Sequence, residues 1–147
     1  MISIDANLLL YAFSVDSPFH AKAQSFLSQL SVREDVALSE FILTEFYLHL
    51  RNPAVLKKPL MAVEAVGVIA SYRQHPCWQI VGFTSHSHKL HNELWKRVEE
   101  EEFPRRRIYD TRTALTLLAH GVREFATANL KDFRGLGFNR VWNPLEE

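Results

Sequence analysis

The sequence contains a single cysteine, Cys77, among its 147 residues. One thiol cannot form a disulfide within the chain or supply a multi-cysteine zinc site, so we expect a reducing compartment, the cytoplasm. An excess of charge of one sign is also absent, because 17 Lys and Arg residues balance 17 Asp and Glu residues. A neutral chain has no overall attraction to nucleic acid, so any such affinity has to come from a local patch.

Membrane-spanning and targeting segments are lacking as well. No apolar run approaches the ~18 residues that a membrane helix needs. The first residues carry an acid at position 5 and no basic stretch, which is unlike a secretory signal. Repeats, low-complexity stretches and linkers rich in Gly or Ser are missing too. We therefore expect a soluble protein with one domain that spans residues 1–147.

Apolar segments of two kinds are present, and hydrophobic residues make up 47% of the chain. Short apolar segments predict strands at residues 1–4, 36–38, 78–83, 123–128 and 140–142. Apolar residues three or four apart predict helices at residues 17–30, 39–50, 60–73, 86–101 and 110–121. Ser39 is a predicted N-cap and Gly121 a predicted left-handed helix stop. Strands that alternate with helices indicate an α/β sandwich with a mainly parallel sheet.

Several acidic or amide side chains lie where the predicted strands end. Asp5 ends the first strand, Asp110 begins a helix, and Asn129 and Asp132 follow the strand at 123–128. In an open parallel sheet, ligands bind beyond the carboxyl ends of the strands, so these side chains are able to converge there. Taken singly, each has a simpler explanation: Asp5 and Asp110 as caps, and Asn129 as a turn residue.

A polar stripe on the helix at 39–50 offers one more acid. Glu40, Thr44, Glu45 and His49 share this stripe, and Glu45 joins the cluster if the stripe faces the same edge of the sheet; the alternative is a solvated helix face. Crowded carboxylates repel one another and raise each other's pKa values, and a divalent cation relieves that repulsion. Oxygen ligands suit Mg²⁺ or Mn²⁺, and such metals assist phosphodiester hydrolysis.

Five segments, in order, resemble the motifs of the PIN domains and, within them, the VapC ribonuclease toxins. The segments are IDANLLLYAF, TEFYLHLRNP, IYDTRTALTLLAHG, EFATANLKDF and GLGFNRVWNPL. The likeness runs from residue 2 to residue 145. It implies a PIN-like three-layer sandwich, with a small, mainly parallel sheet flanked by helices. It also implies an endoribonuclease that uses Mg²⁺ or Mn²⁺, inhibition by a cognate antitoxin protein in a type II toxin–antitoxin system, and frequent homodimers.

The resemblance assigns roles to three acids. Asp5 and Asp110 match the metal-binding acids of the family, and Glu45 matches the helix acid that holds metal or orients the attacking water. Asn129 falls where many members have a fourth acid, which removes one negative charge from the site and predicts a weaker second metal position. Asp132 is the residue that would compensate, or it is structural.

Basic residues near Asp110 are candidates for contacts to RNA. Arg105, Arg106 and Arg107 lie a few residues before it, and they either bind RNA phosphates or belong to a solvated loop with the acids at 99–102. Arg112 either approaches a phosphate or lies on the surface. Two other functions stay open: a PIN-like module that binds RNA or protein with little catalysis, which Asn129 motivates, and a metal-dependent phosphatase, which the absence of a DxD motif at Asp5 disfavours.

Overall fold

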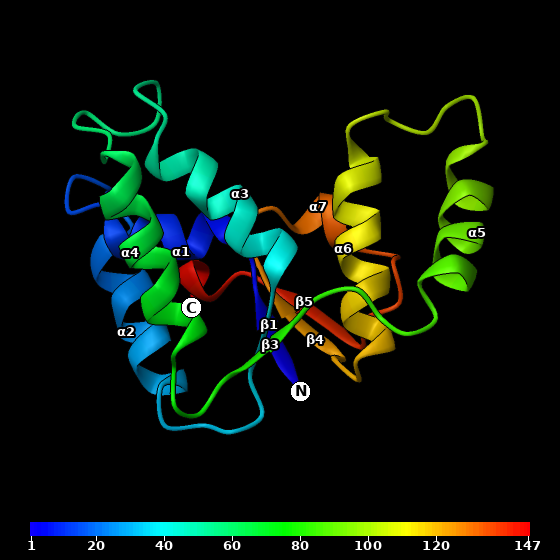
Figure 1. The fold of residues 1–147 in the computed structure, drawn as a ribbon, viewed down its shortest axis with the longest axis horizontal. Coiled ribbons are helices and arrows are strands. Elements are labelled where there is room, and N and C mark those ends of the chain that lie inside the picture. Colours follow the sequence, from blue (N-terminus) through cyan, green and yellow to red (C-terminus); the bar gives the residue numbers. More distant parts are fainter.

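Five short strands form the centre of the fold, and all of their pairings are parallel (Figure 1). A computed structural model describes residues 1–147. The strands are β1 (Ile2–Ile4), β2 (Ala37–Ser39), β3 (Gln79–Val81), β4 (Glu124–Ala126) and β5 (Arg140–Trp142). They form a sheet β1-β4-β5 and a pair β2-β3. A parallel bridge between Ile2 and Val36 joins the two parts and gives the order β3-β2-β1-β4-β5.

Helices cover both sides of these strands, with α1 to α4 on one side in Figure 1 and α5 to α7 on the other. Their bounds are α1 (Ala6–Phe13), α2 (His20–Leu30), α3 (Glu40–Leu50), α4 (Ala62–Arg73), α5 (Ser87–Val98), α6 (Arg107–Ala119) and α7 (Leu130–Phe133), and a 3-10 turn spans Pro144–Glu146. None of these helices is long and apolar enough to cross a membrane. The predicted α/β sandwich with a small parallel sheet is confirmed.

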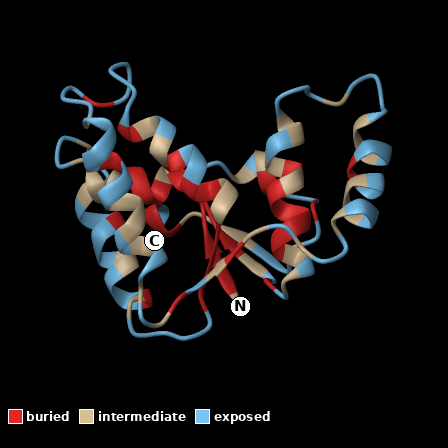
Figure 2. Ribbon diagram, in the orientation of Figure 1, coloured by how far each residue is buried: buried red, intermediate tan, exposed pale blue.

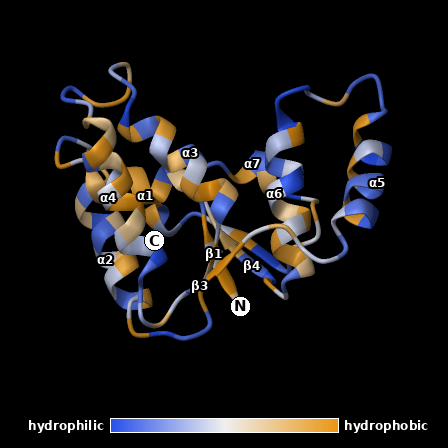
Figure 3. Ribbon diagram, in the orientation of Figure 1, coloured by the Kyte–Doolittle hydropathy of each residue, from blue (hydrophilic) through white to orange (hydrophobic).

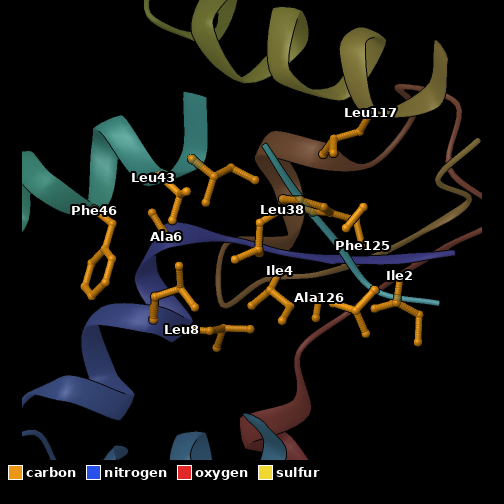
Figure 4. Close-up of a cluster of buried hydrophobic side chains, with 14 of the residues drawn as sticks. Ile2, Ile4, Ala6, Leu8, Leu38, Leu43, Phe46, Leu117, Phe125 and Ala126 are labelled. Carbon is orange, nitrogen blue, oxygen red and sulfur yellow. The ribbon is translucent and has the colours of Figure 1, made fainter. Parts of the chain in front are cut away.

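The core lies where the helices meet the strands. Figure 2 shows buried residues along the central strands and on the inner faces of α1, α3 and α6. Figure 3 shows that β1 and β3 are apolar while α5 is largely hydrophilic. In Figure 4, Ile4 and Phe125 of neighbouring strands lie among side chains from these helices, such as Leu8 and Leu117. Each large apolar side chain buried in this way stabilises the fold by roughly 1.5–3 kcal/mol. This packing fixes the strand ends, from which the site is built.

Local signals in the sequence set two of the helix ends. The Ser39 hydroxyl accepts a hydrogen bond from the Phe41 amide at 3.0 Å and caps α3, and Gly121 has a φ of +91° where α6 stops. Both predictions are confirmed. Other features differ from the prediction: α2 begins at His20 rather than at residue 17, and α6 begins at Arg107 rather than at Asp110. The helices α1, directly after Asp5, and α7 were not predicted.

Candidate active site

Asp5 lies at the carboxyl end of β1 and caps the N-terminus of α1. Its Oδ1 accepts a hydrogen bond from the Ala6 amide at 2.8 Å, which satisfies one of the free N–H groups at the helix start. Its Oδ2 accepts a hydrogen bond from the Thr127 hydroxyl at 2.6 Å. Only 6% of the residue is exposed. The carboxylate is therefore held in one orientation from both sides, and the simple capping interpretation explains only one of its two bonds.

Thr127 is a site residue that the sequence analysis did not identify. It follows β4 as Asp5 follows β1, and the parallel register pairs Ile4 with Ala126, so the next residues of the two strands lie side by side. The Thr127 hydroxyl also accepts a hydrogen bond from the Asn129 amide at 2.9 Å. This arrangement joins the end of β4 to Asp5 and positions Asn129. The signal was present in the sequence: a polar residue near the end of the strand predicted at residues 123–128.

Glu45 projects from the middle of α3 toward the same edge of the sheet. Glu45 and His49 line the cavity beside Asp5, and Nε2 of His49 lies 3.8 Å from Oε1 of Glu45. The predicted polar stripe does not stay together, because Glu40 pairs with Arg73 of α4 at 3.1 Å instead. The face of α3 that carries Glu45 and His49 is therefore the part of the stripe that belongs to the site.

Asp110 lies in the first turn of α6, which begins at Arg107. The pKa of its carboxyl is raised to about 6: burial has the largest effect, the charges of Glu45 and Asp132 add to it, and Arg107 opposes it. Asp110 is not the N-cap, since the helix starts at Arg107. The capping interpretation is therefore wrong, and the helix holds Asp110 beside the other acids.

A cavity of about 330 Å³ brings the predicted acids together. It is lined by Asp5, Glu45, Asp110, Asn129 and His49, together with Asn7 and several apolar side chains. The pKa of Asp5 is raised from an ordinary value of 3.8 to about 7: burial has the largest effect, the charges of Glu45 and Asp110 add to it, and the hydrogen bonds from Thr127 and Ala6 oppose it. Asp132 does not line this cavity, although its charge influences Asp110.

The donor set of this cavity suits a hard divalent cation. All of the acids offer oxygen, and Asn129 adds a neutral amide, which is the chemistry that Mg²⁺ and Mn²⁺ select. No three His, Cys, Asp or Glu side chains form a ready-made cage. A cage is not required, because Mg²⁺ usually keeps several waters and binds one or two protein carboxylates. The oxygen donors of Asp5, Asp110 and Glu45 therefore fit such a cation in their chemistry.

The arginines predicted to contact RNA differ in their surroundings. Arg107 is engaged within the protein: its Nε donates to the carbonyl of Asp132 at 3.2 Å and its Nη2 to the carbonyl of Arg134 at 3.0 Å. Arg105 and Arg106 are exposed. Arg112 is half-buried, with its guanidinium 4.6 Å from the centre of the Phe41 ring. Arg107 therefore supports α7, and the other three are available to a ligand.

Three carboxylates at the carboxyl edge of a parallel α/β sheet define the class of PIN-like proteins with an acidic centre. No protein-family model matches the chain. The sequence is, however, 43% identical over 145 residues to ribonuclease VapC24 of Mycobacterium tuberculosis, which covers 99% of this chain and 97% of that relative. The chain belongs to the VapC ribonuclease family.

Solved structures agree on the fold. FitAcB from Neisseria gonorrhoeae matches with a TM-score of 0.68 at 20% identity and covers 100% of both chains. VapBC2 from Rickettsia felis, bound to a DNA fragment from its promoter, matches with a TM-score of 0.65 at 17% identity over 97% of this chain and 98% of that one. VapC20 of Mycobacterium tuberculosis, described as a sarcin-ricin loop cleaving toxin, has a TM-score of 0.60 at 16% identity over 85% and 87% of the two chains.

Proposed function

We propose that this VapC protein is an Mg²⁺- or Mn²⁺-dependent endoribonuclease whose centre consists of Asp5, Glu45 and Asp110. The observation that carries the proposal is the shared cavity: three carboxylates line it, and the pKa values of Asp5 and Asp110 are raised to about 7 and about 6. No Lys or Arg lines this cavity to neutralise them. At neutral pH such a cluster either retains protons or binds a cation, and in this proposal the cluster binds the cation.

In this proposal each side chain has a distinct task. Asp5 and Asp110 hold the cation, and Thr127 and the Ala6 amide keep the Asp5 carboxylate in its orientation. When bound, the cation supplies a binding site for a phosphate oxygen and stabilises the negative charge that develops during hydrolysis. Glu45, on α3, lines the same cavity and accepts a proton from the attacking water, directly or through a second water.

The remaining polar residues have supporting roles. Asn129 provides a neutral oxygen where many family members have a fourth acid, so we expect it to favour one cation over two. Asp132 is a structural residue in this proposal, since it lies outside the cavity and its carbonyl accepts the Arg107 hydrogen bond. Arg105 and Arg106, exposed beside the start of α6, are the arginines that reach RNA phosphates around the centre.

The proposal includes the partners of a type II toxin. Similar folds occur in a toxin-antitoxin complex from Klebsiella pneumoniae and in VapBC2 bound to DNA of its promoter. By analogy, we propose that a cognate antitoxin protein binds this chain and blocks its centre, and that two copies form a homodimer. We also propose that residues 1–147 make a single PIN domain and that the protein works in the cytoplasm.

Cleavage of total RNA by the purified protein tests this function. We expect cleavage with Mg²⁺ or Mn²⁺, none with EDTA, and a large loss of cleavage in the Asp5→Asn variant. Asp16→Asn is the matched control, because Asp16 is an exposed acid outside the cavity, and we expect it to cleave normally. Equal cleavage by the Asp5→Asn variant would place the centre elsewhere.

Asn129 favours a second candidate function, a PIN-like module that binds RNA or protein with little catalysis. The residue replaces a possible fourth carboxylate on the cavity wall. This alternative predicts that the folded protein binds RNA but cleaves none with any divalent cation. Restored cleavage in an Asn129→Asp variant of an inactive wild type would identify the missing charge as the cause.

A further inference from the structure

A second and larger hollow extends from the acidic cavity between α3 and α6. Its volume is about 850 Å³, and its lining residues come from α3, from α6 (both labelled in Figure 1) and from the residues next to their ends. α3 packs against α1 and α4, and α6 packs against α5 and α7, so neither helix fills the hollow. Glu45, His49 and Asp110 line both spaces, which makes them continuous. We call this second space the α3–α6 groove.

The α3–α6 groove differs chemically from the acidic cavity. Phe41 and Leu48 lie along its α3 wall, and Arg106, Tyr109 and Arg112 lie along its α6 wall. Tyr109 is 66% exposed and Leu48 is 62% exposed, although both are large side chains that proteins usually cover. The groove therefore offers an uncovered aromatic ring and two guanidinium groups directly beside three carboxylates.

Arg112 is the residue whose own surroundings point to a missing ligand. Its guanidinium lies over the Phe41 ring at 4.6 Å, and it takes part in no ion pair. Its Nε is buried and has no hydrogen-bond partner. A buried donor without an acceptor is unfavourable, and the N–H groups of a guanidinium that has no protein acceptor are available to an oxyanion. The Phe41 ring thus positions Arg112 for an anionic ligand in the groove.

We infer that the α3–α6 groove binds an unpaired nucleotide of the RNA next to the phosphate that is cut. Arg112 binds a phosphate oxygen of this nucleotide, and its base stacks on Tyr109. The inference deepens the proposed function and rests on it for the position of the cut phosphate. Its basis is the juxtaposition of a partnerless guanidinium, an exposed aromatic ring and the carboxylates on one continuous surface.

The groove suits unpaired RNA because only an unpaired base has a free face that can stack on Tyr109. A base within a duplex already stacks on its neighbours, so its face cannot reach Tyr109, whereas a base in a loop or an end stacks readily on an aromatic side chain. The groove adjoins the carboxylates through Glu45, His49 and Asp110, so a strand that enters it is led to the acidic cavity. We expect the preferred substrates to be loops or single-stranded segments.

Binding of a labelled oligouridylate and of a labelled RNA duplex, both in EDTA to prevent cleavage, tests the groove. We expect tighter binding of the single strand. Arg112→Met should weaken it by roughly tenfold, as loss of a charge-assisted hydrogen bond does. The slope of log affinity against log salt should fall by about 0.7, the value for one phosphate contact on a single strand. Tyr109→Ala should weaken binding by roughly five- to tenfold and leave that slope unchanged, because stacking releases no counterion.

Two control variants separate the groove from general effects. Lys89→Met removes one positive charge, and Trp95→Ala removes an exposed aromatic ring, both on α5 and away from the groove. Neither should change affinity for the single strand. The inference is overturned if Arg112→Met and Tyr109→Ala bind like the wild type, if Lys89→Met weakens binding as much as Arg112→Met, or if the wild type binds no RNA.

Folding and the proposed activity are checked on the same preparations. Should Arg112→Met not fold, Arg112→Lys serves instead, because it keeps the charge and loses the planar fork.

A wild type that cleaves RNA, with Arg112→Met showing the same kcat/KM, contradicts the groove and leaves the nuclease intact. A wild type that cleaves nothing, yet binds single strands through Arg112 and Tyr109, contradicts the nuclease and leaves the groove intact. Loss of binding to the antitoxin alone, with RNA binding unchanged, would assign the groove to a protein and overturn the inference.

Discussion

The acidic cavity and the α3–α6 groove share the walls of α3 and α6 but hold their side chains differently. In the cavity, both oxygens of Asp5 accept hydrogen bonds from the chain and the residue is 6% exposed. In the groove, Tyr109 is 66% exposed and the Nε of Arg112 has no partner. Fixed charges in a buried site suit chemistry, since they need no reorganisation during the reaction. Exposed rings and cations suit binding, so changes in the two regions should affect different kinetic constants.

Glu45→Gln should have the largest effect on activity and should separate catalysis in the cavity from RNA binding in the groove. Removal of the proton acceptor is expected to lower kcat by about a thousandfold, within the range for general acid–base groups. RNA affinity in EDTA should stay the same or increase, because a negative charge is lost from the edge of the groove. Single-turnover cleavage and binding titrations measure the two effects separately.

Glu40→Gln is the matched control for this variant. Glu40 lies on the same helix but pairs with Arg73, outside the cavity, so its loss should leave kcat within about threefold of the wild type, as for other exposed ion pairs. If both variants lose activity equally, the charge of α3 as a whole matters and Glu45 has no special position.

Asp5→Asn should give the next largest effect, and it has opposite signs for activity and stability. The pKa of Asp5 is about 7 in the folded protein against 3.8 for an ordinary Asp, so the metal-free fold loses stability as pH rises from about 4 to about 7. Asn does not titrate. The variant should therefore be more stable than the wild type at pH 8, by at most about 4 kcal/mol for a shift of about three pKa units, with little such gain near pH 4.

Urea unfolding in EDTA at these two pH values measures the gain. Asp16→Asn provides the baseline, because Asp16 is exposed and lies outside the cavity. If the free energies of unfolding of the wild type and the Asp5→Asn variant change in parallel from pH 4 to pH 8, burial does not raise the pKa of Asp5. The electrostatic argument that the cavity needs a cation would then fail.

Much of the site followed from the sequence, because its residues stand at the ends of apolar segments. The strand before Asp5 and the strand before Thr127 were both predicted, and parallel strands bring their carboxyl ends to one edge. Glu45 followed from the polar stripe on a predicted helix. These are local patterns, and local patterns survive folding when the surrounding segments are strongly apolar.

Other features depend on contacts between distant residues, which no local pattern encodes. Glu40 does not join the site because its side chain pairs with Arg73, which lies 33 residues away in the sequence on α4. Arg107 is not available to RNA because its guanidinium donates hydrogen bonds to the backbone carbonyls of Asp132 and Arg134. The helix α1 was missed for another reason. Its sequence ANLLLYAF is apolar almost throughout, so it shows no clear period, and a short buried helix then resembles a strand.

Of the three substitutions in the cavity, Thr127→Val should have the smallest effect. It tests whether activity depends on the fixed orientation of the Asp5 carboxylate. The change removes the hydroxyl that donates to Asp5 and leaves the Asn129 amide without its acceptor. Partners of this kind typically change metal affinity or activity by about 10- to 100-fold, so we expect a loss near the lower value. The hydrogen bond from Thr127 lowers the pKa of Asp5, so its removal should raise that pKa and shift the acidic limb of the activity profile to higher pH.

Two further variants decide whether this loss comes from Asp5 or from general damage. Thr127→Ser keeps the hydroxyl and should restore both the rate and the pH profile. Thr116→Val removes another buried hydroxyl, which bonds to the Arg112 carbonyl within α6, and should lower stability without moving the pH profile. A Thr127→Val enzyme with an unchanged profile would show that Asp5 is oriented by α1 alone. The cavity would then be no more rigidly built than the groove beside it.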